Sequence, residues 1–214
     1  MTRSAISIPC GELTLEGAWH EATAGPAAGV VIVCHPHPLY GGDQDNHVVQ
    51  GIARAIAGCG LAVLTFNFRG VGASGGTHGN GVAEQDDVRA AIDFATARGA
   101  GPIGLAGYSF GARLAAEVAV REPRVAALAL ISPTFRTWQF PEPDRFDRPV
   151  LVALGDDDEY GSVEAAEALV GLLQRGKLKV VEDGDHFWSF GGDATFREIA
   201  DFFAETMRRG ALTE

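Results

Sequence analysis

Short, uninterrupted runs of apolar residues recur along this chain of 214 residues. Strands buried on both faces have this composition, because neither side of such a strand meets water. Between the runs, apolar residues follow helical spacing, so strands and helices alternate. The alternation predicts an α/β fold with a mostly parallel, doubly wound sheet between two layers of helices. The runs lie at residues 30–34, 61–66, 103–106, 125–131, 150–154 and 178–181.

The amino-terminal residues follow a different pattern. Residues 4–8 and 12–19 alternate polar and apolar, which predicts antiparallel strands with one face exposed. Asp45 or Asn46 is a plausible N-cap for the first helix. The length suits one domain over residues 1–214. The helical spacings are Val48, Ile52, Ile56; Val88, Ile92, Ala95; Leu114, Val118; and Phe196, Ile199, Phe203, Met207.

The net charge argues against two classes of partner, and the cysteine content indicates the cellular compartment. The net charge is -11, from 28 acidic and 17 basic side chains. A protein this acidic repels nucleic-acid phosphates and anionic membrane surfaces, so we expect neither as a partner. No export signal follows Arg3, and three cysteines cannot all pair within the chain. We therefore expect a cytoplasmic protein with reduced thiols.

A glycine-flanked serine stands between a predicted strand and a predicted helix. Residues 107–111 read Gly-Tyr-Ser-Phe-Gly, the G-x-S-x-G pattern of a nucleophile elbow. The pattern alone is weak, because residues 72–76 match it too, around Ser74. Only Ser109 follows an apolar run and opens a helical segment, whereas Ser74 lies in a loop-like stretch. The context predicts that Ser109 is an exposed nucleophile at the helix N-terminus.

A serine hydroxyl is a weak nucleophile that needs a base, which in turn needs an orienting carboxylate. With this type of elbow, the acid and then the base follow the serine along the chain. Of six histidines, only His186 comes after the acidic cluster that follows residues 150–154. The residues alone leave the acid open among Asp156, Asp157 and Asp158.

Four segments together resemble the small, cap-less α/β-hydrolases related in shape to dienelactone hydrolases. The first two are similar to those of bacterial serine hydrolases in which His-Pro-His-Pro is followed by paired glycines. The resemblance spans residues 29–190 and implies an α/β-hydrolase fold with no large cap domain and no cofactor. The segments are residues 35–42 (HPHPLYGG), 67–74 (NFRGVGAS), 107–111 (GYSFG) and 185–187 (DHF).

The resemblance also implies roles for individual residues. It makes Ser109 the nucleophile and His186 the base. It makes Asp158 the acid, since the family places the acid three residues after a glycine, here Gly155. Relatives of the dienelactone type often use cysteine as the nucleophile, whereas this chain has serine at the elbow.

Two backbone N–H groups are needed to stabilise the oxyanion of acyl transfer. One is expected from Phe110, the residue after the nucleophile. The other is expected from the loop after residues 30–34, in which both prolines lack an N–H. His37, Leu39 and Tyr40 remain as candidates, and the resemblance favours His37.

These features predict a serine hydrolase that cleaves small esters or thioesters through an acyl-enzyme. An amidase or peptidase of the same fold is the alternative, and a non-catalytic binding protein is a third. Only residues 132–148 are available as a lid, and their three prolines oppose a long helix. We expect an open pocket suited to short acyl groups. Its candidate lining residues are Leu39, Tyr40, Trp138 and Trp188.

Other motifs carry weaker signals. His35 and His37 could suggest a metal site, but the proline between them restrains their convergence, and we expect no metal. Residues 70–75 mimic a dinucleotide fingerprint, yet no helix opens after them to hold a phosphate. Arg69 is expected to donate structural hydrogen bonds to nearby loops. The expected partner is a small-molecule ester, and a homodimer is compatible with the sequence.

Overall fold

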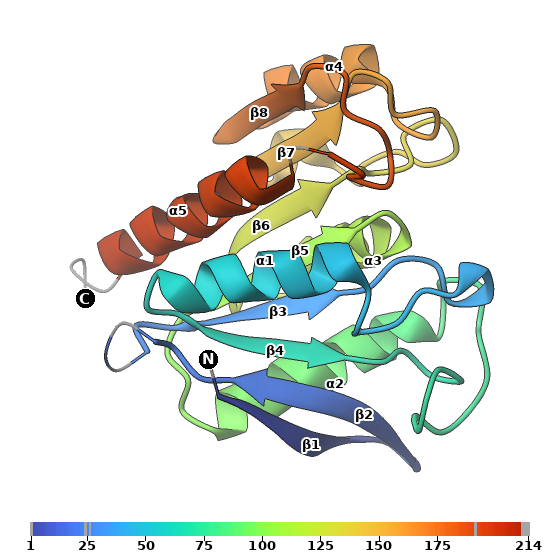
Figure 1. Cartoon of the computed structure of the whole chain (residues 1–214), viewed down its shortest axis with the longest axis vertical. Coiled ribbons are helices and arrows are strands. Elements are labelled where there is room, and N and C mark those ends of the chain that lie inside the picture. Colours follow the sequence, from blue (N-terminus) through green and yellow to red (C-terminus); the bar gives the residue numbers. More distant parts are fainter. Residues whose placement is uncertain (1, 24, 26, 191, 211–214) are drawn as a thin grey trace.

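The computed structural model describes residues 2–23, 25, 27–190 and 192–210 and is built around one sheet (Figure 1). The described residues form eight strands in the order β1-β2-β4-β3-β5-β6-β7-β8. Strands β3 to β8 run parallel, whereas β1 and β2 are antiparallel at one edge. The strands are β1 (Arg3–Cys10), β2 (Leu13–His20), β3 (Val30–Cys34), β4 (Ala62–Phe66), β5 (Ile103–Tyr108), β6 (Val125–Ile131), β7 (Val150–Gly155) and β8 (Gly176–Val181).

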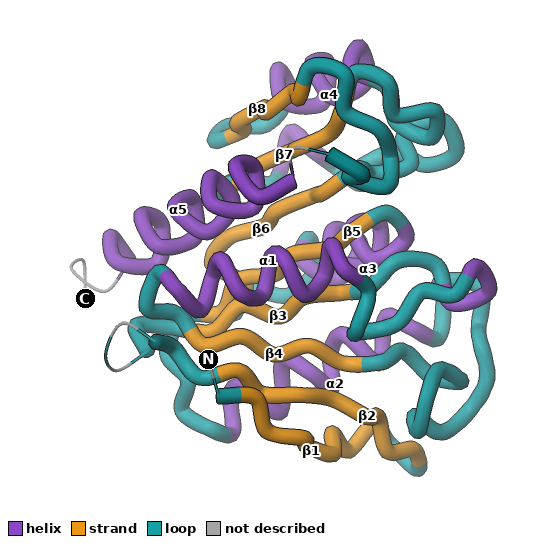
Figure 2. The backbone as a smooth tube through the Cα atoms, in the orientation of Figure 1, coloured by secondary structure: helices purple, strands orange, loops and turns teal. Residues whose placement is uncertain are grey.

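Helices cover both faces of the sheet, with α1 and α5 on the near face and α2 and α3 behind it (Figures 1 and 2). The Asn46 side chain caps α1 by accepting a hydrogen bond of 3.0 Å from the N–H of Val48. Among the described residues, no helix combines the length and the apolar character needed to cross a membrane. The helices are α1 (His47–Gly58), α2 (Glu84–Ala97), α3 (Phe110–Ala119), α4 (Val163–Leu172) and α5 (Gly192–Gly210).

The predicted α/β architecture is confirmed, and its central strands are fully buried. Every residue of β3 and β4 is buried, as expected for strands with helices on both faces. β3 pairs with β4 on one side and with β5 on the other. The chain therefore reverses its direction of travel across the sheet beside β3. Ligands of such sheets bind at this reversal, beyond the carboxyl ends of the strands.

Two local expectations are corrected by the structure. The strand expected at 178–181 is not buried on both faces, because β8 is an edge strand with only β7 beside it, and most of its residues are half-buried. Lys179 of β8 pairs with Glu198 of α5 at 2.7 Å. The other correction is α4, which the helical spacing did not predict. It is capped by Ser162, whose side chain accepts from the N–H of Ala165.

The chain between β6 and β7 is too irregular to cover the sheet. Within residues 132–149 the one regular element is a short 3-10 turn, η2 (Pro143–Arg145). Phe140 and Phe146 of this stretch are buried and pack edge to face, with ring centroids 5.6 Å apart. The stretch thus packs down onto the domain, and no large cap covers the carboxyl edge of the sheet.

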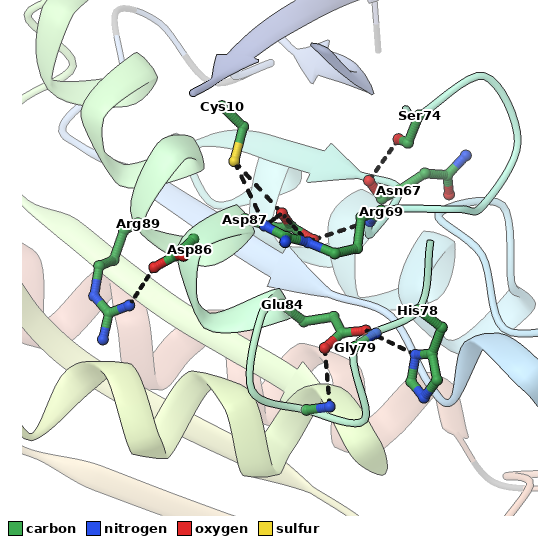
Figure 3. Close-up of polar contacts among 11 residues, drawn as sticks. Cys10, Asn67, Arg69, Ser74, His78, Gly79, Glu84, Asp86, Asp87 and Arg89 are labelled. Atoms are coloured by element: carbon green, nitrogen blue, oxygen red, sulfur yellow. Dashed lines mark hydrogen bonds and ion pairs between the residues drawn. The ribbon is translucent and has the colours of Figure 1, made fainter. Parts of the chain in front are cut away.

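A buried ion pair anchors the loop after β4 to the start of α2 (Figure 3). The Asp87 carboxylate is fully buried and accepts from the Arg69 side chain at 2.6 and 2.9 Å. It also accepts from the Arg69 backbone N–H at 2.9 Å. Arg69 is thus a structural donor, but its partner lies in α2 and not in a nearby loop as expected. In the same loop, the Ser74 hydroxyl donates to the carbonyl of Asn67 at 2.7 Å.

We predict that Asp87→Asn lowers the free energy of unfolding by about 2–4 kcal/mol, because the mostly buried Arg69 guanidinium loses its counter-charge. Asp86→Asn is the matched control, because the neighbouring Asp86 forms a solvent-exposed ion pair with Arg89. The control should cost less than about 1 kcal/mol. Urea unfolding monitored by circular dichroism measures both variants. Equal losses would contradict the structural role of the buried pair.

Candidate active site

Ser109 occupies the tight turn between β5 and α3. Its backbone has φ 55° and ψ -116°, a conformation that non-glycine residues rarely adopt. The turn is held by a hydrogen bond of 2.9 Å from the Ser109 N–H to the carbonyl of Ile131 on β6. The side chain is 8% exposed and lines a cavity at the carboxyl edge of the sheet.

The glycines on either side of Ser109 are required by close backbone contacts. A β-carbon at Gly107 would collide with the backbone carbonyl of Gly111. A β-carbon at Gly111 would collide with the carbonyls of Cys34 and His35, at the end of β3. The absence of side chains at both positions lets α3 begin directly against the strand ends. This packing fixes where the serine hydroxyl stands.

His186 lies in the loop after β8 and contacts the serine. Its Nε2 is 3.1 Å from the Ser109 Oγ, and its Nδ1 is 2.8 Å from an Asp158 oxygen. The loop is tied to the elbow because the Tyr108 hydroxyl donates to the His186 carbonyl at 2.9 Å. The imidazole also packs against the Tyr160 ring, with centroids 4.7 Å apart. Ser109, His186 and Asp158, which were expected to act together, therefore lie within hydrogen-bonding distance of one another in sequence from serine to acid.

Only one carboxylate of the acidic cluster is in a position to orient the histidine. Asp156 and Asp157 are exposed, whereas Asp158 is buried. Asp158 accepts from the N–H groups of Tyr160 and Gly161 at 2.9 and 2.8 Å. Burial by itself raises the pKa of Asp158, but hydrogen bonding and charge from His186 outweigh burial, and the net pKa is lowered. The carboxylate is thus ionised at neutral pH.

Ser132 and Trp188 help to stabilise the ionised carboxylate of Asp158, a role that the sequence did not indicate. The Trp188 indole N–H donates to the Ser132 hydroxyl at 3.0 Å, and this hydroxyl helps to lower the pKa of Asp158. Both residues adopt positive φ, 44° for Ser132 and 57° for Trp188. Such strain persists only where surrounding contacts enforce it. The one sequence feature that could have indicated this role is the position of Ser132 directly after the strand β6.

The loop after β3 leaves one N–H free beside the elbow. The Leu39 N–H donates to Nδ1 of His37, and the Tyr40 N–H donates to the carbonyl of the same residue. Within the described residues, the N–H groups of His37 and Phe110 donate to no protein atom, and both residues line the cavity. Their rings lie 4.7 Å apart. Among the three candidates for the second oxyanion donor, His37 is the one left available.

His35 is committed to the protein structure. Its Nε2 accepts from the N–H of Phe68 at 3.0 Å, and its Nδ1 donates to the carbonyl of Pro36 at 2.6 Å. Burial lowers its pKa to about 4, so the ring is neutral at neutral pH. Within the described part of the chain, no three His, Cys, Asp or Glu side chains are grouped to hold a metal ion.

The cavity has a volume of about 740 Å³ and a mixed polar and aromatic lining. Tyr40 and Trp138 line it, as expected. Leu39 and Trp188 do not, which corrects two of the four expected substrate contacts. Leu39 is 68% exposed on the short turn η1 (Pro38–Tyr40), outside the cavity. Trp188 is only 5% exposed, because its ring packs against Phe196 of α5.

Known proteins share this fold and about a third of the aligned residues. Residues 25–146 match the family described as serine aminopeptidase, S33. An uncharacterized protein of Rickettsia prowazekii is 32% identical over 199 residues, covering 88% of this chain and 83% of its own. An α/β serine hydrolase homologue from Coxiella burnetii superposes with a TM-score of 0.85 at 33% identity, covering 94% and 96% of the two chains. A serine hydrolase without a lid from Xanthomonas campestris gives 0.80 at 30% identity, covering 98% and 95%.

We predict that Gly111→Ala destabilises the protein by at least about 3 kcal/mol, because the new methyl group forces the backbone of β3 and α3 apart. Gly58→Ala is the control, since Gly58 is also helical but has no atom within 4 Å of the position of a β-carbon. The control should gain up to about 1 kcal/mol from helix propensity. Denaturant midpoints report both changes. A stabilising effect of both substitutions would show that the elbow is not closely packed.

Proposed function

The chain belongs to the α/β-hydrolases of the family described as serine aminopeptidase, S33. Within this family, we propose that it is a serine esterase. The proposed reaction is hydrolysis of small esters or thioesters through an acyl-enzyme on Ser109. One observation carries the proposal: a continuous hydrogen-bonded chain runs from Ser109 through His186 to the buried Asp158. These hydrogen bonds convert the weakly nucleophilic serine hydroxyl into a reactive one.

Acylation begins when the ester carbonyl lies over the Ser109 Oγ. As the oxygen attacks the carbonyl carbon, its proton passes to Nε2 of His186, 3.1 Å away. Negative charge then develops on the carbonyl oxygen, and the N–H groups of Phe110 and His37 bind it. The positive end of the α3 dipole adds to this stabilisation. The histidine returns its proton to the departing alcohol, and the acyl group stays on the serine.

Deacylation repeats these steps with water. His186 takes a proton from water, the hydroxide attacks the acyl carbon, and the proton returns to Ser109 as the acid leaves. Asp158 remains ionised throughout. It holds the imidazole with Nδ1–H toward itself, so that Nε2 faces the serine, and it stabilises the imidazolium that forms.

The form of the cavity supports a small substrate, and its lining favours an ester over a peptide with a free amino terminus. Residues 132–149 contain no α-helix, only the short 3-10 turn η2, so no helical lid covers the cavity. Among the described residues that line it, none is Asp or Glu. A free amino terminus is a cation and calls for a carboxylate partner. The described lining residues thus offer no carboxylate for the aminopeptidase activity in the family description.

We predict that a fluorophosphonate probe labels the wild-type protein at Ser109 and that Ser109→Ala removes the labelling. The same substitution should lower the rate of ester hydrolysis by at least about a thousandfold. Ser74→Ala is the matched control, because Ser74 has the same glycine-flanked motif but lies in the turn after β4. Labelling that survives Ser109→Ala would contradict the proposed nucleophile, and a protein that is never labelled would favour a binding role.

A panel of para-nitrophenyl esters tests the chain length of the substrate. We expect kcat/KM to be highest for acetate to butyrate and to fall for longer acyl groups, because no α-helix covers the cavity and the end of a long acyl chain stays in water. Matched anilides should react at least about a hundredfold more slowly. Faster turnover of octanoate or decanoate would contradict the small-substrate proposal, and comparable rates for anilides would favour an amidase.

A further inference from the structure

The cavity carries one permanently charged side chain, and this side chain is a cation. The sequence has 28 acidic residues and a net charge of -11. Even so, among the described residues that line the cavity, the only Arg, Lys, Asp or Glu is Arg113. The cavity wall therefore differs in charge from the protein around it. A ligand that pairs with an arginine is anionic.

Arg113 is fixed close to the nucleophile. It lies on α3 four residues after Ser109, and its backbone N–H donates to the Ser109 carbonyl at 3.4 Å. Its Nε donates to Glu117 at 2.8 Å, one further turn along the helix. The Glu117 carboxylate also accepts from Gln85 at 2.9 Å and from the Trp138 indole at 3.1 Å. These bonds hold the guanidinium from one side and limit its movement.

The other surroundings of Arg113 leave its terminal nitrogens accessible. A β-carbon at Gly81 would lie 3.3 Å from Cζ and from both terminal nitrogens, so one face of the guanidinium packs on this glycine. Gly81 has a φ of 83°, which glycine adopts without strain. Within the described residues, Nη1 and Nη2 of Arg113 donate to no protein atom. Two parallel donors are thus free at the cavity wall.

The neighbouring histidines extend this wall. The His37 ring lies 5.1 Å from the His78 ring, and both residues line the cavity with Arg113. Burial first, and then the charges of His78 and Arg113, lower the pKa of His37. The nearby Glu84 is fully buried and accepts from the N–H groups of Gly79 and Gly81 (Figure 3). Glu84 pairs with His78 at 2.7 Å and Glu117 pairs with Arg113 at 2.8 Å. Neither carboxylate lines the cavity, so Arg113 is the permanently charged group that a ligand meets there.

We propose that the natural substrates are esters that carry a carboxylate, which Arg113 binds through its two terminal nitrogens. A carboxylate matches the paired donors of a guanidinium in a bidentate arrangement. The inference rests on the proposed esterase function and names its substrate class. Anchoring the carboxylate one helical turn from Ser109 orients the scissile carbonyl at the elbow, which a small substrate with little apolar surface otherwise achieves poorly.

Two matched pairs of substrates test the proposal and locate the anion. The acyl-side pair is para-nitrophenyl hydrogen adipate and its methyl-capped diester. The alcohol-side pair is meta-acetoxybenzoate and meta-acetoxybenzamide. Each pair differs in one negative charge. For wild type we expect kcat/KM to favour the anionic member of at least one pair by about tenfold to a hundredfold, the range of one charged hydrogen-bonding contact. The pair that responds shows which side of the ester carries the anion.

Variants then assign the preference to the arginine. In Arg113→Met, the ratio of anionic to neutral kcat/KM should fall to about one, whereas Arg113→Lys should retain part of it. Arg54→Met, an exposed position on α1 outside the cavity, makes the same change in net charge and should keep the wild-type ratio.

A wild-type ratio near or below one in both pairs would overturn the anion proposal and needs no variant to fold. A high ratio that survives Arg113→Met would overturn the assignment to Arg113. Both results leave the esterase function standing if the neutral esters are turned over and Ser109→Ala stops this turnover. The absence of turnover for all four esters would instead contradict the esterase function itself.

Discussion

The backbone turn between β5 and α3 is the constraint on which the candidate site depends. Ser109 has a positive φ there, and the strain is held because Gly107 and Gly111 lie against neighbouring backbone with no room for a β-carbon. A side chain at Gly107 would separate α3 from β5, and a side chain at Gly111 would separate α3 from the end of β3. The hydroxyl position, the free N–H of Phe110 and the positive end of the helix are consequences of one packing arrangement.

A similar backbone contact joins the loops that carry the acid and the base. Gly155 at the end of β7 has no room for a β-carbon, because the backbone of Gly184 occupies that space. The Asp157 N–H donates to the Gly184 carbonyl at 3.1 Å, so the two loops are bonded as well as packed. Asp158 and His186 follow within two or three residues. The separation between carboxylate and imidazole is thus set by the strand ends.

The sequence was sufficient for the features that depend on local pattern. Apolar runs gave the buried strands, and the strand-turn-helix context separated Ser109 from Ser74. The features it missed depend on distant parts of the chain. Trp188 resembles a pocket aromatic until its bonds to Ser132 are seen. Arg113 resembles a surface residue of an amphipathic helix, because Gly81, whose backbone it packs on, is 32 residues earlier and has no side chain to signal a contact.

Trapping the covalent intermediate is the most direct test of the account. Wild-type protein is mixed with para-nitrophenyl acetate, quenched in acid during turnover, digested and mapped by mass spectrometry. The account predicts one acetyl group on the peptide that contains Ser109, gained during the burst and lost once the ester is consumed. Steady hydrolysis with no acetyl group on this serine, or with the acetyl group on another residue, would contradict it.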